Sequence, residues 1–331
     1  MTRDTVRGVP RSLLSLPPIL LVAAAVLGLS WTPLPVAQAH AQDRPRRTGA
    51  LAPSPSSRAL TGGVVTLLTP GPAEILFPRG TFTMGSSRVE VQLALEACRR
   101  EPLGSECKPE MFENELDAHR VTLSPFWLDR TEVTVQAYQR CVDTGACSPP
   151  PYHQGARRFD APSLPVSLVS WEDARAFCHF VGKQLPTEAQ WERAARGLSG
   201  RRFPWGYHYA TRRTNHGVWA LDNTDASDGY SELAPVGSFP QGRTTEQVED
   251  LAGNVAEWTL DSYEDGYEAM PVQDPTGPAF GAYKVVRGGA YSFGMPWLRG
   301  AARMFRKAST RAPYLGFRCA RSASPNPSGH R

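Results

Sequence analysis

The chain has 331 residues and a formal net charge of +4, with 36 Lys and Arg against 32 Asp and Glu. This near balance, together with the lack of a Lys/Arg block, argues against a nucleic-acid or anionic-membrane surface. No P-loop, dinucleotide fingerprint, GxSxG elbow or HExxH pattern occurs, which argues against several common enzyme classes. The length admits two average domains or one large domain.

Residues 1–41 are predicted to be a signal peptide. Three arginines precede Pro17–Leu29, a 13-residue apolar run that suits a signal core and is short for a membrane span. Small residues at 37, 39 and 41 fit a cleavage site, and no cysteine follows the core to carry a lipid anchor. We therefore expect export to the periplasm, cell envelope or medium; the alternative is an uncleaved anchor. The mature chain would carry 33 basic and 31 acidic side chains.

One domain is predicted between two irregular segments. Residues 42–62 are rich in Pro, Ser and Arg, which is typical of a flexible linker. Residues 323–331 are expected to form a disordered tail. The intervening residues 63–322 contain no second linker and no internal repeat, which favours a single domain.

Short strands and three capped helices are predicted in this domain. The strand-like stretches are residues 81–84, 121–123, 126–128 and 284–287. The helices are expected to follow the capping residues Thr134, Ser170 and Thr187, and to end near Gly145, Gly182 and Gly197. Nearly all of 197–281 is expected to be loop, because Gly, Pro, Asp, Asn and Trp recur throughout it. So much irregular backbone needs crosslinks or bound ions to order it.

Six cysteines in an exported chain predict disulfides rather than a metal site. Six cysteines allow fifteen pairings. The short spacings favour Cys98–Cys107 and Cys141–Cys147 as local links, which leaves Cys178–Cys319 to close a long loop.

A series of motifs carries a family resemblance. In chain order they are "RGTFTMGS" (79–86), "HRVTLSPFWLDRTEVTVQAY" (119–138), "PVSLVSWEDARAFCHFVGKQLPTEAQWERAARG" (165–197), "FPWG" (203–206), "APVGSFP" (234–240), "DLAGNVAEWTLD" (250–261), "RGGAYS" (287–292) and "LGFRCA" (315–320). Together they resemble the formylglycine-generating enzyme family, also called the sulfatase-modifying factor family, over about residues 74–321. The resemblance implies a loop-rich α+β fold related to C-type lectins, and it also pairs Cys178 with Cys319.

The resemblance implies a copper-dependent oxidase, but the expected copper ligands are missing. The family's enzymes oxidise a sulfatase cysteine to formylglycine with oxygen and a copper ion held by two cysteines. Those cysteines correspond to the interval Ala290–Gly300, which contains none here and looks shorter than in the enzymes. Cu(I) prefers soft thiolate ligands, and the single thioether of Met295 is a poor substitute. The animal family members also have a second disulfide, which would fall at Ala195 and Gly300.

Calcium is the better-supported ligand. The resemblance implies one calcium site at Asp250, Glu257 and the carbonyls of Gly253 and Val255. It implies another at Asn215, Asp228 and the carbonyls of His216 and Tyr230. Alternating side-chain and backbone oxygens suit Ca²⁺. The alternative is that these acids cap turns and bind loop amides without metal.

Several side chains are candidates for a ligand groove, and the resemblance places Arg303 on its wall. An arginine there can bind a peptide carbonyl or a carboxylate through two hydrogen bonds; the alternative is a buried ion pair. The candidates are Arg299, Arg303, Arg306, Trp205, Trp297 and Tyr291. His119 is expected to be a hydrogen-bonded loop residue.

These observations predict a calcium-stabilised, non-catalytic binding or accessory module for an extended peptide or a glycan. We expect no copper cofactor and no catalytic residue. One alternative is an oxidoreductase of the same family that acts through an altered, non-cysteine metal site. Another is a purely structural envelope protein. Fold alone does not choose among them.

Overall fold

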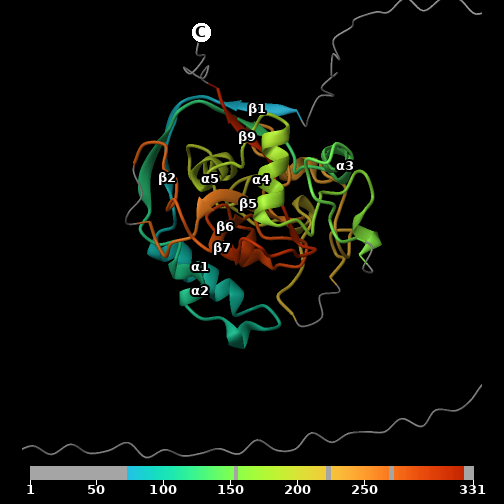
Figure 1. Ribbon diagram of the computed structural model, residues 1–331. Coiled ribbons are helices and arrows are strands. Elements are labelled where there is room, and N and C mark those ends of the chain that lie inside the picture. Colours follow the sequence, from blue (N-terminus) through green and yellow to red (C-terminus); the bar gives the residue numbers. More distant parts are fainter. Residues whose placement is uncertain (1–72, 153–155, 221–224, 268–271, 324–331) are drawn as a thin grey trace, which may run out of the picture. The chain divides into compact units, whose positions relative to one another are not determined.

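The computed structural model describes residues 73–152, 156–220, 225–267 and 272–323 (Figure 1). All of them belong to the second of two compact units, Thr66–Arg331. The predicted signal peptide, the linker and residues 324–331 of the tail lie outside the described residues. Within the described part, no helix has the length and apolar character needed to cross a membrane.

Nine short strands form three small sheets in the described residues. One sheet has the order β1 (Glu74–Phe77), β4 (Phe126–Asp129), β9 (Ala320–Ser322), and a two-stranded sheet pairs β2 (Gly80–Met84) with β3 (His119–Leu123). The third has the order β7 (Arg303–Lys307), β6 (Tyr283–Arg287), β5 (Ala256–Ser262), β8 (Leu315–Gly316). In the third sheet β5 pairs with β8 in parallel and with β6 in antiparallel orientation, and a bulge interrupts β5 between Trp258 and Ser262.

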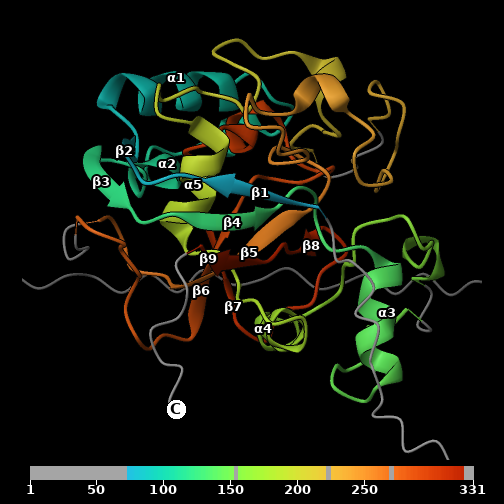
Figure 2. The same cartoon turned by 90° about the horizontal axis from the view of Figure 1, so that it is seen from above.

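The helices are short and capped. The α-helices are α1 (Arg88–Cys98), α2 (Glu110–Glu113), α3 (Val135–Asp143), α4 (Trp171–Phe180) and α5 (Glu188–Arg196). The described residues also contain five short 3-10 segments: η1 (Gly104–Glu106), η2 (Arg157–Phe159), η3 (Thr211–Arg213), η4 (Pro240–Gly242) and η5 (Met295–Leu298). In two views at right angles, α1 and α2 lie far from α3 (Figures 1 and 2). The mixed, loop-rich architecture is the fold class that the sequence predicts.

The three predicted helices are present and begin where expected. The side chains of Thr134, Ser170 and Thr187 each accept a hydrogen bond from the backbone N–H three residues later. Thr187 and Gln190 form the reciprocal capping box at the start of α5. These signals are local, so the sequence alone is enough to locate them.

Three sequence interpretations need correction. Helix α1 was not predicted, although Ser87 and Glu90 form a full capping box at its start. Strand β5 lies inside the stretch that was expected to be nearly all loop, because β6 and β8 supply its hydrogen-bonding partners. His119 is the first residue of β3 rather than a loop residue, and its ring packs on Tyr267.

All six cysteines form disulfides: Cys98–Cys107, Cys141–Cys147 and Cys178–Cys319. These are the pairs that the spacing and the resemblance predict. Cys178 and Cys319 are fully buried within the main hydrophobic cluster, beside Phe177 and Phe317. The chain therefore has no free thiol.

Candidate functional site

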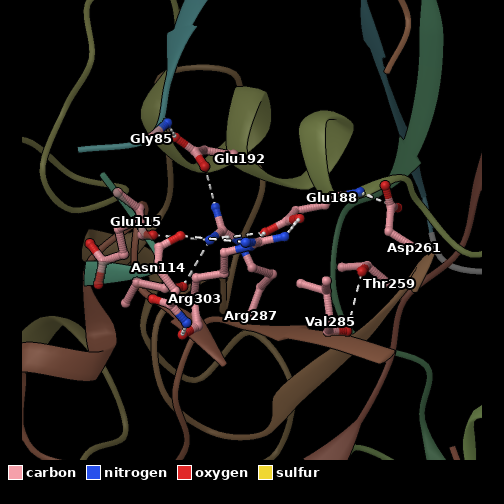
Figure 3. A network of polar contacts seen from close by, with 12 residues as sticks. Gly85, Asn114, Glu115, Glu188, Glu192, Thr259, Asp261, Val285, Arg287 and Arg303 are labelled. Carbon is pink, nitrogen blue, oxygen red and sulfur yellow. Dashed lines mark hydrogen bonds and ion pairs between the residues drawn. The ribbon is translucent and has the colours of Figure 1, made fainter. Parts of the chain in front are cut away.

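Helix α5 places two carboxylates in the protein interior. Glu188 and Glu192 are four residues apart, so they lie on one face of the helix, and both are fully buried. Buried carboxylates need partners. The partners come from the third sheet: Arg287 of β6 and Arg303 of β7, which are neighbours in the register (Figure 3).

Arg303 is held on several sides. Its Nε and Nη2 donate to the two carboxylate oxygens of Glu188 at 2.7 and 3.1 Å, and its Nη1 donates to the carbonyls of Glu264 and Gly266 at 2.8 and 2.9 Å. Burial lowers the pKa of Arg303, but the Glu188 carboxylate, with smaller contributions from Tyr267 and Tyr263, raises it, and the net shift is upward. The guanidinium is therefore charged, paired and held in place.

Arg287 fixes the end of the loop that follows it. Its guanidinium donates to the carbonyls of Gly300, Ala301 and Ala302 at 3.0–3.1 Å and pairs with Glu192. The loop leaves β6 through Gly288 and Gly289, whose φ angles of 91° and 65° favour glycine. A Cβ at Gly289 would lie 2.8 Å from the Trp297 carbonyl oxygen, so the chain is too close for a side chain there.

Arg299 is also structural. Its Nη1 and Nη2 donate to the two oxygens of Glu115 at 2.8 and 2.6 Å, and both residues are buried. The guanidinium lies over the Phe112 ring. Buried ion pairing, the alternative that the sequence left open for Arg303, therefore describes Arg303 and Arg299 alike.

A pocket of about 330 Å³ lies beside this network. Its lining is mostly aromatic and thioether in character, with one carboxylate, one amide and two arginines. It consists of Glu110, Met111, Asn114, Trp219, Tyr263, Phe293, Trp297, Arg303, Met304, Phe305 and Arg306. Phe293 and Trp297 come from the Ala290–Gly300 loop. We call this the aromatic pocket.

Asn114 leaves an unused acceptor at the aromatic pocket. Its Nδ2 donates to the carbonyl of Arg303 at 3.1 Å and to the Tyr263 hydroxyl at 3.3 Å, which orients the amide. Its Oδ1 is buried and has no hydrogen-bond partner. Such a group costs stability unless a ligand or water donates to it. Sequence reasoning missed Asn114 because it follows α2, a four-residue helix too short to show a periodic pattern.

Arg306 is the accessible cation of the aromatic pocket. Its Nε donates to the Tyr314 hydroxyl at 3.1 Å and its Nη1 to the Phe305 carbonyl at 2.7 Å. Among the described residues, no carboxylate lies within ion-pair distance of it. The charged groups of the pocket lining are thus Arg306, Arg303, which is paired with Glu188, and Glu110. Asn114 adds a buried acceptor, and the other lining side chains are aromatic or Met.

The predicted groove residues divide into two groups. Arg303, Arg306 and Trp297 meet at the aromatic pocket. Trp205 packs with Phe203 and Met295 in a separate cluster, so Met295 fills space there. Tyr291 belongs to a further cluster with Phe159 and Leu164. The structure therefore does not join Arg299, Trp205 and Tyr291 to the pocket.

At the first predicted calcium position, the Glu257 carboxylate is occupied by hydrogen bonds, and a different carboxylate, Glu132, has no hydrogen-bond donor. Both oxygens of Glu257 accept from Arg318 at 2.7 Å, and one also accepts from Trp191 Nε1 at 2.9 Å. Asp250 accepts from the Gly237 amide at 2.6 Å. Beside it lies Glu132, which is fully buried and whose two oxygens have no hydrogen-bond donor.

Glu132 and Asp250 are close enough to repel each other. Burial raises the pKa of both groups, and the Asp250 charge adds to the large upward shift of Glu132. A divalent cation between the two carboxylates would relieve this cost. The described residues contain no group of three or more His, Cys, Asp or Glu side chains arranged for a metal. Carbonyl oxygens would therefore have to complete the site. Glu132 could not be recognised from the sequence as a partner of Asp250, because the two lie 118 positions apart.

The residues of the second predicted calcium position lie close together. Asp228 accepts from the amides of His216 and Tyr230 at 2.6 and 2.8 Å, so these residues adjoin. Asn215 donates through Nδ2 to the Glu232 carbonyl at 2.8 Å, and its Oδ1 is buried without a partner. An unpaired buried oxygen beside a carboxylate fits a hard cation. The Asp228 contacts also match the turn-capping alternative.

Comparison with known proteins defines the family. Residues 65–323 match the family described as sulfatase-modifying factor enzyme 1-like domain. The formylglycine-generating enzyme of Streptomyces coelicolor is 32% identical over 82% of this chain and 96% of its own length. The chain thus belongs to the formylglycine-generating enzyme, or sulfatase-modifying factor, family.

Other relatives show the range of the family. A Mus musculus protein named inactive C-alpha-formylglycine-generating enzyme 2 is 38% identical over 48% of this chain and 50% of its own length. The structure of PvdO from Pseudomonas aeruginosa is 26% identical with a TM-score of 0.60, and it covers 76% of this chain and 94% of PvdO. This chain spans about half the length of the mammalian relatives it matches.

Gly300, at the end of the Ala290–Gly300 loop, lies beside Ala195. A Cβ at Gly300 would lie 3.3 Å from the Cβ of Ala195. Disulfide-linked residues have Cβ atoms about 3.5–4.5 Å apart. Gly300 and Ala195 are therefore neighbours, as the second disulfide of the animal members requires of their counterparts.

Proposed function

We propose that this chain is an exported, non-catalytic binding module of the formylglycine-generating enzyme family, and that its ligand occupies the aromatic pocket. The observation that carries the proposal is the state of the cysteines. All six form disulfides, and the loop expected to hold the copper ligands supplies Phe293 and Trp297 to the pocket instead. Without a thiolate pair the chain has no ligands of the kind that the family's copper chemistry uses.

An extended peptide is the ligand that the pocket chemistry favours over a glycan. Aromatic and Met side chains offer an apolar surface for one side chain of a ligand. The Asn114 Oδ1 accepts one N–H, and Arg306 binds a carbonyl or carboxylate. A sugar would bury several hydroxyls against these apolar groups with few partners.

Calcium belongs to this proposal as a structural ion. Glu132 and Asp250, with the carbonyls of Gly253 and Val255, would hold one ion, and the Asn215–Asp228 group a second. When bound, calcium supplies positive charge that neutralises the buried carboxylates. Apart from Glu132, the residues that would hold calcium belong to the loops around 215–257, a stretch with few helices or strands, and their contacts order these loops.

The alternative function is an oxidoreductase that uses a different metal at the aromatic pocket. It is favoured by the extensive match to a Streptomyces coelicolor protein named formylglycine-generating enzyme. Metal analysis of the purified chain separates the two. The binding module predicts calcium without stoichiometric copper or iron, and the enzyme predicts a stoichiometric redox metal.

The ligand proposal is tested by selection from a displayed peptide library and a glycan array. We expect peptides with an aromatic or apolar anchor, and we expect Arg306→Gln and Phe305→Ser to weaken their binding. Arg88→Gln, an exposed arginine on α1, is the matched control. The proposal that a peptide binds in the aromatic pocket would be rejected if only glycans were selected. It would also be rejected if Arg306→Gln and Phe305→Ser left peptide binding unchanged.

A further inference from the structure

A second pocket, of about 350 Å³, shares no lining residue with the aromatic pocket. Its distinctive residues are Arg201, Arg213, Arg243, Thr244, Thr245 and Trp205. A neighbouring hollow of about 260 Å³ shares Trp205 and Arg213 with it and continues along residues 206–210. We call the first of these the arginine pocket. The inference below does not depend on the proposed function.

The arginine pocket has an excess of positive charge. Arg201 pairs with Glu246 at 2.9 Å, and its Nε is buried without a hydrogen-bond partner. In the part of the chain that the structure describes, neither Arg213 nor Arg243 has a carboxylate within ion-pair distance. Three guanidinium groups therefore face one carboxylate, a charge balance that favours an anionic ligand.

The backbone is packed so that Arg213 and Arg243 come together. Arg213 ends η3, and Arg243 directly follows η4. A Cβ at Gly242 would lie only 1.8 Å from the carbonyl oxygen of Arg213, so the two segments touch only because residue 242 is glycine. Thr244 holds the next turn, since its N–H donates to the Val248 carbonyl at 2.9 Å. The two cations thus sit on a packed framework.

Trp205 forms a fixed aromatic wall between the two hollows. Its ring stacks on Phe203 with a centroid distance of 5.3 Å and an interplanar angle of 8°. Its Nε1 donates to the His208 carbonyl at 2.9 Å, which sets the ring orientation. A ring attached to the anion can lie against this wall while the anion enters the arginine pocket.

We propose that the arginine pocket binds a phosphate monoester or a sulfate ester carried on a sugar ring. The oxyanion accepts hydrogen bonds from Arg213 and Arg243, whose planar guanidinium groups match tetrahedral oxyanions. Thr244 and Thr245 also line this pocket. The sugar ring lies against Trp205 in the adjacent hollow. Pocket size agrees with a small ligand, for which about 300–1,000 Å³ is usual.

The test is calorimetric titration of the full chain with four probes at low salt: glucose 6-phosphate, glucose 6-sulfate, glucose and inorganic phosphate. We expect one or both esters to bind, glucose not to bind, and inorganic phosphate to bind more weakly than the ester. The two esters distinguish a phosphate from a sulfate ligand. Binding should weaken as salt rises, because exposed charges are screened. No binding of either ester, or equal binding of inorganic phosphate, would overturn the proposal.

Variants locate the site. Arg213→Gln and Arg243→Gln should each weaken ester binding roughly tenfold or more, since each removes a charge-assisted hydrogen bond to the oxyanion. Trp205→Leu should weaken binding of the ester more than binding of inorganic phosphate. Arg88→Gln should bind like the wild type. Arg243 is exposed, so its variant is expected to fold. Equal affinities of Arg213→Gln, Arg243→Gln and wild type would place the ligand elsewhere and reject the site.

Discussion

Arg303 of β7 and Glu188 of α5 form a two-point ion pair in which neither side chain is exposed to solvent. The pair joins residues 115 positions apart and ties the third sheet to α5. It also changes the role of Arg303. The sequence suggested Arg303 as a ligand-groove residue, but its guanidinium donates hydrogen bonds to groups inside the protein. Arg306, three residues later, lines the aromatic pocket.

The ion pair predicts unequal effects of two nearby substitutions. Arg303→Ala should lower the free energy of unfolding by about 3–5 kcal/mol, because it leaves the buried Glu188 carboxylate without its partner. Arg306→Gln should lower it by less than about 1 kcal/mol, because Arg306 has no ion pair among the described residues. Urea denaturation of both variants measures the difference. Equal losses would contradict the structural role of Arg303.

Calcium removal should destabilise the protein. Calcium at one hundred times its dissociation constant stabilises by about 2.7 kcal/mol, so EGTA should lower the melting temperature. Asp250→Asn and Glu132→Gln should each remove part of this calcium-dependent shift, and purified protein should contain calcium. Asp160→Asn, at an exposed position, is the control and should keep the full shift. A melting temperature that is the same in calcium and EGTA would contradict the calcium proposal.

Asp261 predicts a pH dependence of stability. It is fully buried beside Glu188 and accepts from the amides of Glu188 and Gly277, and burial raises its pKa from 3.8 to about 7. Between about pH 4 and pH 7 the folded state therefore binds more protons at this group than the unfolded state does. The stability contributed by Asp261 falls as pH rises through this window, by at most about 1.4 kcal/mol per pH unit.

The variant Asp261→Asn isolates this effect. The free energy of unfolding of wild type minus that of Asp261→Asn should decrease from pH 4.5 to pH 7.5. Other titrating groups are common to both proteins and cancel in the difference. Asp160→Asn should show a constant offset from wild type over the same range. A constant offset for Asp261→Asn as well would show that Asp261 has an ordinary pKa in the folded protein.

The sequence predicts those features of the fold whose causes are local. Thr134, Ser170 and Thr187 mark helix starts because each cap contacts an amide three residues away. The cap at Ser87 has the same form and would have revealed α1. Family motifs supplied the architecture and the order of the segments, which are not apparent from local pattern.

The remainder of the site depends on contacts between distant positions. Glu132 meets Asp250, and Arg303 meets Glu188, only after three small sheets have folded together. The sequence around a charged loop residue does not show whether its side chain faces solvent or a buried partner. For this reason the sequence could suggest Arg303 as a ligand residue and could not suggest Asn114, whose unpaired oxygen is a property of the folded pocket.

We expect that the chain does not carry out the family's copper-dependent cysteine oxidation. The direct measurement is incubation of the full chain with copper, oxygen and a Cys-x-Pro-x-Arg peptide, followed by mass spectrometry of the peptide. The Streptomyces coelicolor enzyme serves as the positive control, and a metal-free reaction as the background. We predict no formylglycine above that background, because every cysteine of the chain is in a disulfide. Formylglycine formed by this chain in copper, above the metal-free level, would contradict the account.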